Sequence, residues 1–204
     1  MNDSLSARER ILEASLAVVR RDGPAGFTMD AIAREAGLSK GGLFHHFASK
    51  EALLAAFLEF YTQRAFHLVQ TRLKALAPEG RARLIRTMIA VAFPEHAPSA
   101  AEFQDDIAFM RSHRDFMLGM VTAGMISPEL LAPLRAMRTR IWSELLSDPE
   151  TGEDQLLLWL AMHGFWMART IGAILPDDPH CDTVAKLLIS RAESLAAPAK
   201  EGTR

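Results

Sequence analysis

The chain has 204 residues, of which 49% are hydrophobic, so it can bury the core of one large or two modest domains. Its formal net charge of −2 argues against a protein that holds nucleic acid by overall positive charge, and its single cysteine excludes an internal disulfide. Tyrosine is almost absent, while Ala, Leu, Met, Arg and Glu dominate, which favours helices over strands. We therefore expect an all-α protein.

The beginning of the chain does not resemble a signal peptide, because charged residues such as Asp3 and Arg8 precede any apolar segment. The longest apolar run, residues 156–168, contains His163 and is shorter than the ~18 residues that a membrane span needs. These features predict a cytoplasmic protein with no membrane partner. We also expect no metal and no cofactor, because a lone cysteine cannot build a thiolate cluster.

The first predicted helix begins at Ser6, which forms a capping-box pattern with Glu9 three residues later. Apolar residues then recur at helical spacing up to the stop signal Gly23-Pro24. This helix is expected to brace the segment that follows it.

Residues 27–52 predict a helix-turn-helix. Thr28 can cap a helix that Gly37 ends, and Ser39 can cap a second, short helix buried by Leu43 and Phe47. In this motif the second helix lies in the DNA major groove and presents its N-terminal residues to the bases. Those residues are Lys40, Gly41 and Gly42.

Positive charge gathers locally in the segment 39–50, although the chain as a whole is slightly acidic. The segment contains no carboxylate, and its basic residues are Lys40, His45, His46 and Lys50. The two histidines are neighbours that diverge by about 100° on a helix, so they cannot share one metal ion, and a phosphate contact is the preferred interpretation.

A long helix is predicted after the motif, capped by Ser49 and ending at Pro78. It could act as a lever between the DNA-reading helix and the second half of the chain. Further helices are predicted at 81–93, 100–113, 115–123, 128–146, 153–175 and 179–195. The starts of the helices at 128 and 179 are marked by Ser127-Pro128 and Asp178-Pro179. The predicted domains are 1–50, which binds DNA, and 51–204, which binds an effector and dimerises.

The predicted helix 153–175 has two unlike faces. Its small residues form one stripe, made of Ala161, Gly164, Ala168 and Gly172, which would let another helix approach closely. With residues of the last helix, this stripe is a candidate dimer seam; ordinary packing within the chain is an equally good explanation. The predicted contributions of the last helix are Val184, Leu188, Arg191 and Leu195.

Large aromatic and methionine side chains suggest an adaptable apolar cavity, so a small hydrophobic effector is expected. Residues 103–125 are crowded with Phe and Met beyond one helix face, and the opposite face of the helix 153–175 adds tryptophans. The candidate pocket residues are Phe103, Met110, Phe116, Met120, Trp142, Trp159, Met162, His163 and Trp166. His163 fits a buried core histidine better than a ligand contact.

The segment 8–54 resembles the TetR family of bacterial transcriptional regulators, over about a quarter of the chain. The resemblance is carried by residues 33–47, AREAGLSKGGLFHHF, and residues 49–53, SKEAL, in which caps, turn glycine and core positions are kept together. It implies a homodimer, a palindromic DNA operator, and a C-terminal domain that binds a small molecule and thereby releases DNA.

The resemblance also implies roles for single residues. Thr28, His46 and Lys50 match phosphate contacts, whereas Lys40 and Gly41 match positions that face base edges. Lysine can donate to guanine O6 and N7, so Lys40 is the choice for direct readout. Phe44 stands where many relatives have tyrosine and lacks the hydroxyl donor. The complete predicted DNA-binding set is Thr28, Ser39, Lys40, Gly41, Gly42, Phe44, His45, His46 and Lys50.

These observations predict a DNA-binding regulator, a repressor rather than an enzyme, that a small hydrophobic molecule releases from its operator. Two alternatives stay open. One is a helical adaptor without DNA binding, which is compatible with the near-neutral charge of the N-terminal segment. The other is a small all-α enzyme that uses His163 or the pair His180-Cys181.

Overall fold

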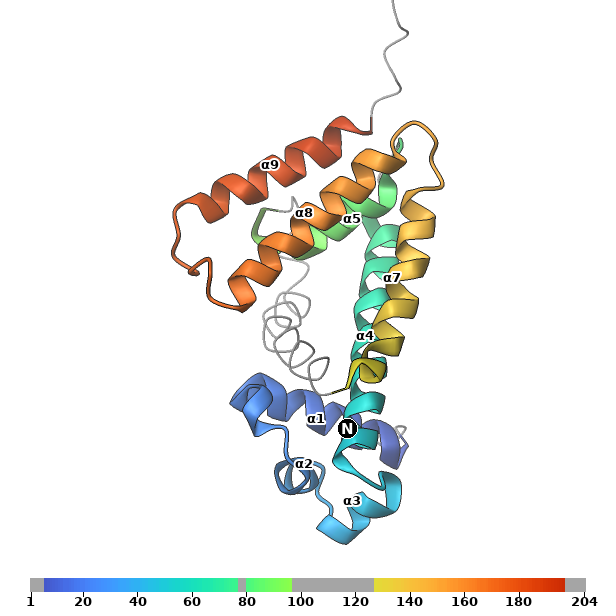
Figure 1. Ribbon diagram of the computed structural model, residues 1–204, viewed down its shortest axis with the longest axis vertical. Helices are drawn as coiled ribbons and strands as arrows, with labels where there is room; N and C mark the ends of the chain where they lie inside the picture. The colour runs from blue at the N-terminus through green and yellow to red at the C-terminus, as the bar shows by residue number, and fades with distance from the viewer. Residues whose placement is uncertain (1–5, 77–79, 97–126, 197–204) are drawn as a thin grey trace, which may run out of the picture. The chain divides into compact units, whose positions relative to one another are not determined.

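The computed structural model describes residues 6–76, 80–96 and 127–196. Within these ranges the chain is helical and has no strand, which confirms the all-α expectation (Figure 1). The α-helices are α1 (Ala7–Asp22), α2 (Met29–Glu35), α3 (Lys40–His46), α4 (Lys50–Leu76), α5 (Arg83–Ala92), α7 (Ala132–Leu145), α8 (Gly152–Thr170) and α9 (His180–Ser194). The predicted helices 100–113 and 115–123 lie outside the described residues.

The described residues divide into two compact units. The first contains residues 6–64 and 127–136, and the second contains residues 65–76, 80–96 and 137–196. The long helix α4 is continuous and contributes to both units. The predicted functional boundary after residue 50 stays a prediction, since compactness alone does not assign function.

The first unit contains α1, α2, α3 and the beginning of α4, together with residues 127–136. The capping box of α1 is confirmed: Ser6 Oγ accepts from Glu9 N–H at 3.2 Å, and Glu9 Oε2 accepts from Ser6 N–H at 2.8 Å. Arg64 of α4 pairs with Glu13 of α1. The core side chains of this unit come from all four helices and include Ile11, Leu16, Val18, Ile32, Leu43, Leu53, Phe57 and Tyr61.

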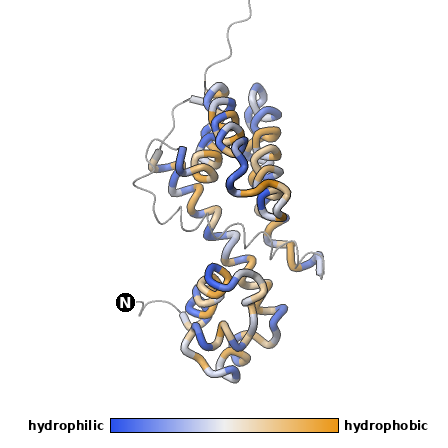
Figure 2. Tube along the Cα trace, turned by 90° about the vertical axis from the view of Figure 1, so that its left-hand side faces the viewer, coloured by the Kyte–Doolittle hydropathy of each residue, from blue (hydrophilic) through white to orange (hydrophobic). Residues whose placement is uncertain are grey.

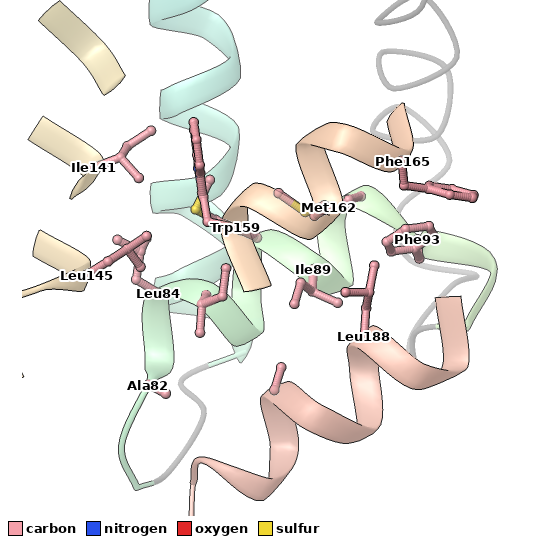
Figure 3. Close-up of a cluster of buried hydrophobic side chains, with 14 of the residues drawn as sticks. Ala82, Leu84, Ile89, Phe93, Ile141, Leu145, Trp159, Met162, Phe165 and Leu188 are labelled. Atoms are coloured by element: carbon pink, nitrogen blue, oxygen red, sulfur yellow. The ribbon is translucent and has the colours of Figure 1, made fainter. Parts of the chain in front are cut away.

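The second unit packs α5, α8 and α9 around an apolar core to which α4 and α7 add side chains. Figure 3 shows Leu188 of α9 directed towards Ile89 of α5, and Phe93 close to Phe165 of α8. The rings of Phe93 and Phe165 have centroids 5.7 Å apart. Burial of such side chains stabilises this unit by about 1.5–3 kcal/mol each.

The end of α8 differs from the prediction. The helix was expected to continue to residue 175, but it ends at Thr170, and Gly172 adopts a left-handed φ of +77°. The N–H groups of Ala173 and Ile174 then bond to the carbonyl of Ala168 at 2.8 and 3.1 Å. The apolar residues 171–175 resemble a continuing helix in sequence, yet the glycine ends it.

The start of the helix predicted at 128 also differs. It begins as a 3-10 turn, Pro128–Leu131, before α7. Ser127 does not cap it; its hydroxyl instead donates to Glu129 Oε2 at 3.0 Å. At α9, Asp178 Oδ1 accepts from His180 N–H at 2.8 Å, and the helix begins at His180, one residue later than predicted.

Figure 2 shows that the helices of both units carry hydrophilic and hydrophobic residues in turn along their length.

Among the described helices, none combines the length and apolar character that crossing a membrane requires.

Candidate functional site

The corner between α2 and α3 has the geometry of a helix-turn-helix. Thr28 Oγ1 accepts from Ala31 N–H at 3.2 Å and caps α2, and Ser39 Oγ accepts from Gly42 N–H at 3.0 Å and caps α3. Between them, Gly37 adopts a φ of +68°, a left-handed conformation that glycine tolerates without strain. Both caps and the glycine stop occur where the sequence predicts them.

The short helix α3 has one buried and one exposed side. Leu43 is fully buried, and Phe47 at the end of the helix is covered by the guanidinium of Arg8, 4.5 Å from the ring centroid. Phe44 is 42% exposed, an unusual fraction for a large aromatic ring. The other predicted DNA-binding residues are exposed or half-buried: Thr28, Ser39, Lys40, Gly41, His45 and Lys50 are exposed, and Gly42 and His46 are half-buried.

The two glycines of α3 differ in how much space the structure leaves for a side chain. A Cβ at Gly41 would meet only Ser39 Oγ, at 4.0 Å, whereas a Cβ at Gly42 would come within 3.3 Å of the same atom. Glycine inside a helix costs about 1 kcal/mol relative to alanine. The fold would therefore accept a larger residue at Gly41. The glycine there keeps the backbone of α3 accessible from outside.

Ion pairs fix several charged side chains of the first unit. The ammonium of Lys40 lies 3.0 Å from Asp30 Oδ1, so α2 and α3 are joined by an exposed ion pair. Arg21 of α1 binds Glu35 of α2 at 2.7 Å. Sequence spacing gave no sign of either pair, because the partners are 10 and 14 residues apart.

In the second unit, the predicted pocket residues Trp142, Trp159 and His163 form a stacked cluster. The rings of Trp159 and His163 have centroids 3.8 Å apart, and Trp142 meets Trp159 edge-on at 5.5 Å. His163 Nδ1 lies 2.9 Å from the carbonyl oxygen of Trp159. Burial lowers the pKa of His163 below its usual value, and the hydrogen bond to Trp159 partly offsets this. Burial thus favours the neutral form of the ring.

The tryptophans of the second unit bring polar groups into this apolar region. The indole N–H groups of Trp142, Trp159 and Trp166 are buried and have no acceptor within the described part of the chain. Arg138 lies over the ring of Trp142 at 5.0 Å, and Arg169 over that of Trp166 at 5.4 Å. Met162 is buried in the same core, and Figure 3 shows it on α8 together with Trp159. The other predicted pocket residues lie outside the described residues: Phe103, Met110, Phe116 and Met120.

The small-residue stripe of α8 faces outward from the second unit. Ala161 and Gly164 are exposed, Ala168 is half-buried, and a Cβ at Gly164 would meet nothing within 4 Å. Gly172 does not belong to this stripe, because α8 ends before it.

Sequence reasoning missed two leucines beside the stripe. Leu157 is 63% exposed and Leu160 is 45% exposed. The spacing 157, 161, 164, 168 continues the same helical stripe by one turn, so the signal for Leu157 was present in the sequence.

The four residues of α9 predicted for the dimer seam have different environments. Arg191 is exposed, and Val184 and Leu195 are half-buried against the core of their own unit. Leu188 is only 5% exposed and belongs to that core, so its assignment to the seam is wrong. Its neighbour Leu187 is the exposed leucine of the helix; adjacent residues point about 100° apart.

The sequence His180-Cys181-Asp182 does not form a nucleophile with a base. His180 Nδ1 lies 3.0 Å from Asp178, and Asp182 binds His96 Nε2 at 2.7 Å. Cys181 Sγ points instead to a backbone carbonyl, that of Leu175, at 3.7 Å. Over the described ranges, no group of His, Cys, Asp and Glu side chains has the arrangement of a metal site.

Two family profiles match this sequence. The profile described as "Bacterial regulatory proteins, tetR family" matches residues 11–57, which contain the helix-turn-helix. The profile described as "Tetracyclin repressor-like, C-terminal domain" matches residues 82–193, more than half of the 204-residue chain.

Known regulators are similar to the chain to different extents. It is 26% identical to the HTH-type transcriptional regulator BetI of Escherichia coli O45:K1 over 192 residues, 90% of this chain and 92% of BetI. It is 30% identical to the uncharacterized HTH-type transcriptional regulator YerO of Bacillus subtilis over 119 residues, 58% of this chain. That match covers only 36% of YerO, so the chain spans about a third of that relative's length.

A solved structure of a regulator from Saccharomonospora viridis, in complex with choline, has the same fold. It superposes with a TM-score of 0.67 and is 19% identical, and the match covers 92% of this chain and 95% of that one. The capped helices α2 and α3 form the helix-turn-helix that the first family profile describes, and the second profile accounts for most of the remaining chain. The chain therefore belongs to the TetR family of bacterial regulatory proteins, a family of helix-turn-helix transcriptional regulators.

Proposed function

We propose that this protein is a homodimeric repressor that binds a palindromic DNA operator and is released from it by a small apolar effector. The proposal rests on the geometry of α3. The caps at Thr28 and Ser39 and the buried Leu43 fix this helix, and Lys40 and Phe44 on it are exposed to solvent. In a dimer, two such helices about 34 Å apart would enter successive major grooves on one face of the DNA. A regulator of this kind would act in the bacterial cytoplasm.

The DNA contacts follow from the exposed groups around α3. Lys40 would donate to guanine O6 or N7, and Gly41 and Gly42 would let the helix backbone approach the bases closely. Thr28, His46 and Lys50 would contact phosphates, which position the domain without reading sequence. Ser39, Phe44 and His45 complete the surface. The small number of cations predicts a modest dependence of affinity on salt.

The dimer would form through the outward stripe of α8. Leu157, Leu160, Ala161 and Gly164 are exposed, and small residues let a second helix approach closely. From α9, the exposed Leu187 and Arg191 would join it, with Val184 and Leu195 at its edge.

The effector would bind beside the tryptophan cluster of the second unit. Trp142, Trp159, Met162, His163 and Trp166 offer large apolar surfaces with a few polar groups, which suits a small apolar molecule. The Saccharomonospora viridis regulator of the same fold holds a small molecule, which supports an effector here. Because α4 is continuous between the units, a change at one end can reach the other; the effector needs only to favour a different spacing of the two α3 helices.

Selection of genomic DNA fragments by the purified protein tests this function, followed by fluorescence anisotropy with the selected duplex. We expect one palindromic sequence, bound by a dimer. Lys40→Ala and Lys50→Ala should weaken binding and leave the dimer intact in analytical ultracentrifugation. Two variants that bind like the wild type would contradict the assignment, and a protein that selects no DNA would favour an adaptor.

A further inference from the structure

We propose that Asp30 is a specificity-determining residue, which holds Lys40 towards a base edge and away from the phosphates. This inference rests on the proposed function, because it assumes that α3 reads DNA. The ammonium nitrogen of Lys40 lies 3.0 Å from Asp30 Oδ1 and 3.2 Å from Oδ2. The pair joins the first turn of α2 to the first residue of α3.

Lys40 needs a positioning partner because its chemistry is not selective. It is the only lysine or arginine in α3. Its ammonium is a compact point charge on a flexible stem, and it binds a phosphate oxygen as readily as a guanine. On any DNA sequence, a free Lys40 would therefore choose between a base edge and the neighbouring backbone, and the backbone contact carries no sequence information.

The carboxylate of Asp30 favours the contact of Lys40 with a base edge over its contact with a phosphate. An ammonium carries three N–H donors, so Lys40 can keep its contact with Asp30 and still donate to guanine O6 or N7. A phosphate oxygen could accept from the same ammonium, but it would then lie close to the carboxylate of Asp30, and the two negative groups repel each other. Asp30 thus disfavours the sequence-independent contact and leaves the base contact available.

The backbone of Asp30 is well fixed, although its side chain is exposed. It lies two residues after the Thr28 cap, where the helix dipole favours an acidic residue. The side chains of Lys40 and Asp30 are 60% and 65% exposed, so the pair adds little to folding stability. Removing the charge of Asp30 should leave the protein folded.

Asp22 offers a matched control in the same unit. Its carboxylate also pairs with a cation, since Asp22 Oδ2 lies 3.0 Å from Arg21. Without Asp22, Arg21 would still bind Glu35 at 2.7 Å. Asp22→Asn therefore removes the same charge as Asp30→Asn without freeing a residue of α3.

The experiment measures the affinity of the full-length protein for its selected operator and for a scrambled duplex, by anisotropy, from about 50 to 200 mM salt. In Asp30→Asn, the affinity for the scrambled duplex should rise about threefold to tenfold, because Lys40 becomes one more phosphate contact. The slope of log affinity against log salt for that duplex should steepen by about 0.9. The affinity for the operator should not rise, so the ratio of the two affinities falls.

The double variant decides whether Asp30 acts through Lys40. In the Lys40→Ala background, Asp30→Asn should leave the ratio unchanged. Three results would overturn the inference. The ratio of operator affinity to scrambled-duplex affinity could stay unchanged in Asp30→Asn, or Asp22→Asn could lower it equally. Asp30→Asn could also lower this ratio in the Lys40→Ala background. A wild-type protein that selects no sequence overturns the proposed function together with this inference, whereas a preserved ratio in Asp30→Asn overturns the inference alone.

Discussion

The two units of the protein are held together in different ways. In the first, the two short helices α2 and α3 are fixed by caps and turn residues, such as Thr28, Gly37 and Ser39, whose partners lie three or four positions away. In the second, helices of 10 to 19 residues are fixed by a shared apolar core. Local signals specify the surface proposed to meet DNA, and distributed packing specifies the unit proposed to sense the effector. Three substitutions and a change of pH should separate the two units experimentally, with expected effects that decrease in that order.

Leu43→Ala should have the largest effect, because it leaves a cavity in the small core behind α3. Leu43 is fully buried, and such a substitution costs about 2–5 kcal/mol of unfolding free energy. All three tryptophans lie at residues 142–166, in the second unit, so far-UV circular dichroism should detect the loss at lower urea than tryptophan fluorescence does. Phe44→Ala, at an exposed site, is the control and should change stability by less than about 0.5 kcal/mol. Coincident transitions in Leu43→Ala would mean that the units unfold together.

Leu157→Arg should dissociate the proposed dimer, because it places a charge in the outward stripe of α8. Sedimentation equilibrium should show a dimer dissociation constant raised by about a hundredfold or more, equivalent to roughly 2.7 kcal/mol. Leu146→Arg is the matched control, since Leu146 is also exposed, at 47%, but lies outside the stripe. If Leu157→Arg remains a dimer while Leu146→Arg does not, the seam has been placed on the wrong surface.

Gly41→Ala should separate folding from DNA binding. Alanine stabilises a helix by about 1 kcal/mol over glycine, and the protein has room for the added Cβ. We expect a small rise in the urea midpoint together with weaker operator binding, because the methyl group would face the bases. Unchanged operator affinity would show that the backbone of α3 does not approach DNA closely at this residue.

Lowering the pH should weaken the second unit through His163, with a smaller effect. Burial lowers the pKa of His163 in the folded protein, so the folded state disfavours the proton that the unfolded chain accepts. Stability is therefore full above the unfolded pKa of about 6.5 and falls as the pH drops below it. The tryptophan-monitored urea midpoint should decline between about pH 7.5 and 5.5 by more in the wild type than in His163→Gln. An equal decline in both proteins would assign the pH dependence to other groups.

The sequence predicts most clearly the structure that depends on near neighbours. The capping box of Ser6 with Glu9 and the caps at Thr28 and Ser39 involve residues three positions apart, and all three are present. Pairs such as Arg64 with Glu13 join residues 51 positions apart and left no trace in sequence spacing. Their partners are set by how the helices pack.

Two errors in the second unit have simple physical causes. Gly172 was assigned to the face of a helix that it instead ends, because the apolar residues around it imitate a continuing helix. Leu188 is predicted at the dimer seam but belongs to the core, because Leu187 and Leu188 are both leucines and only the rotation of α9 separates core from solvent. Four of the nine predicted pocket residues fall within residues 97–126, which lie outside the described structure.

The continuity of α4 limits how this protein can be recombined with its relatives. A chimera that joins the helix-turn-helix of one regulator to the second unit of another would have a junction within a single 27-residue helix. Each added residue at such a junction would turn everything after it by about 100° and advance it by about 1.5 Å. Functional junctions should therefore preserve the length of α4 or change it by about seven residues, which is close to two full turns.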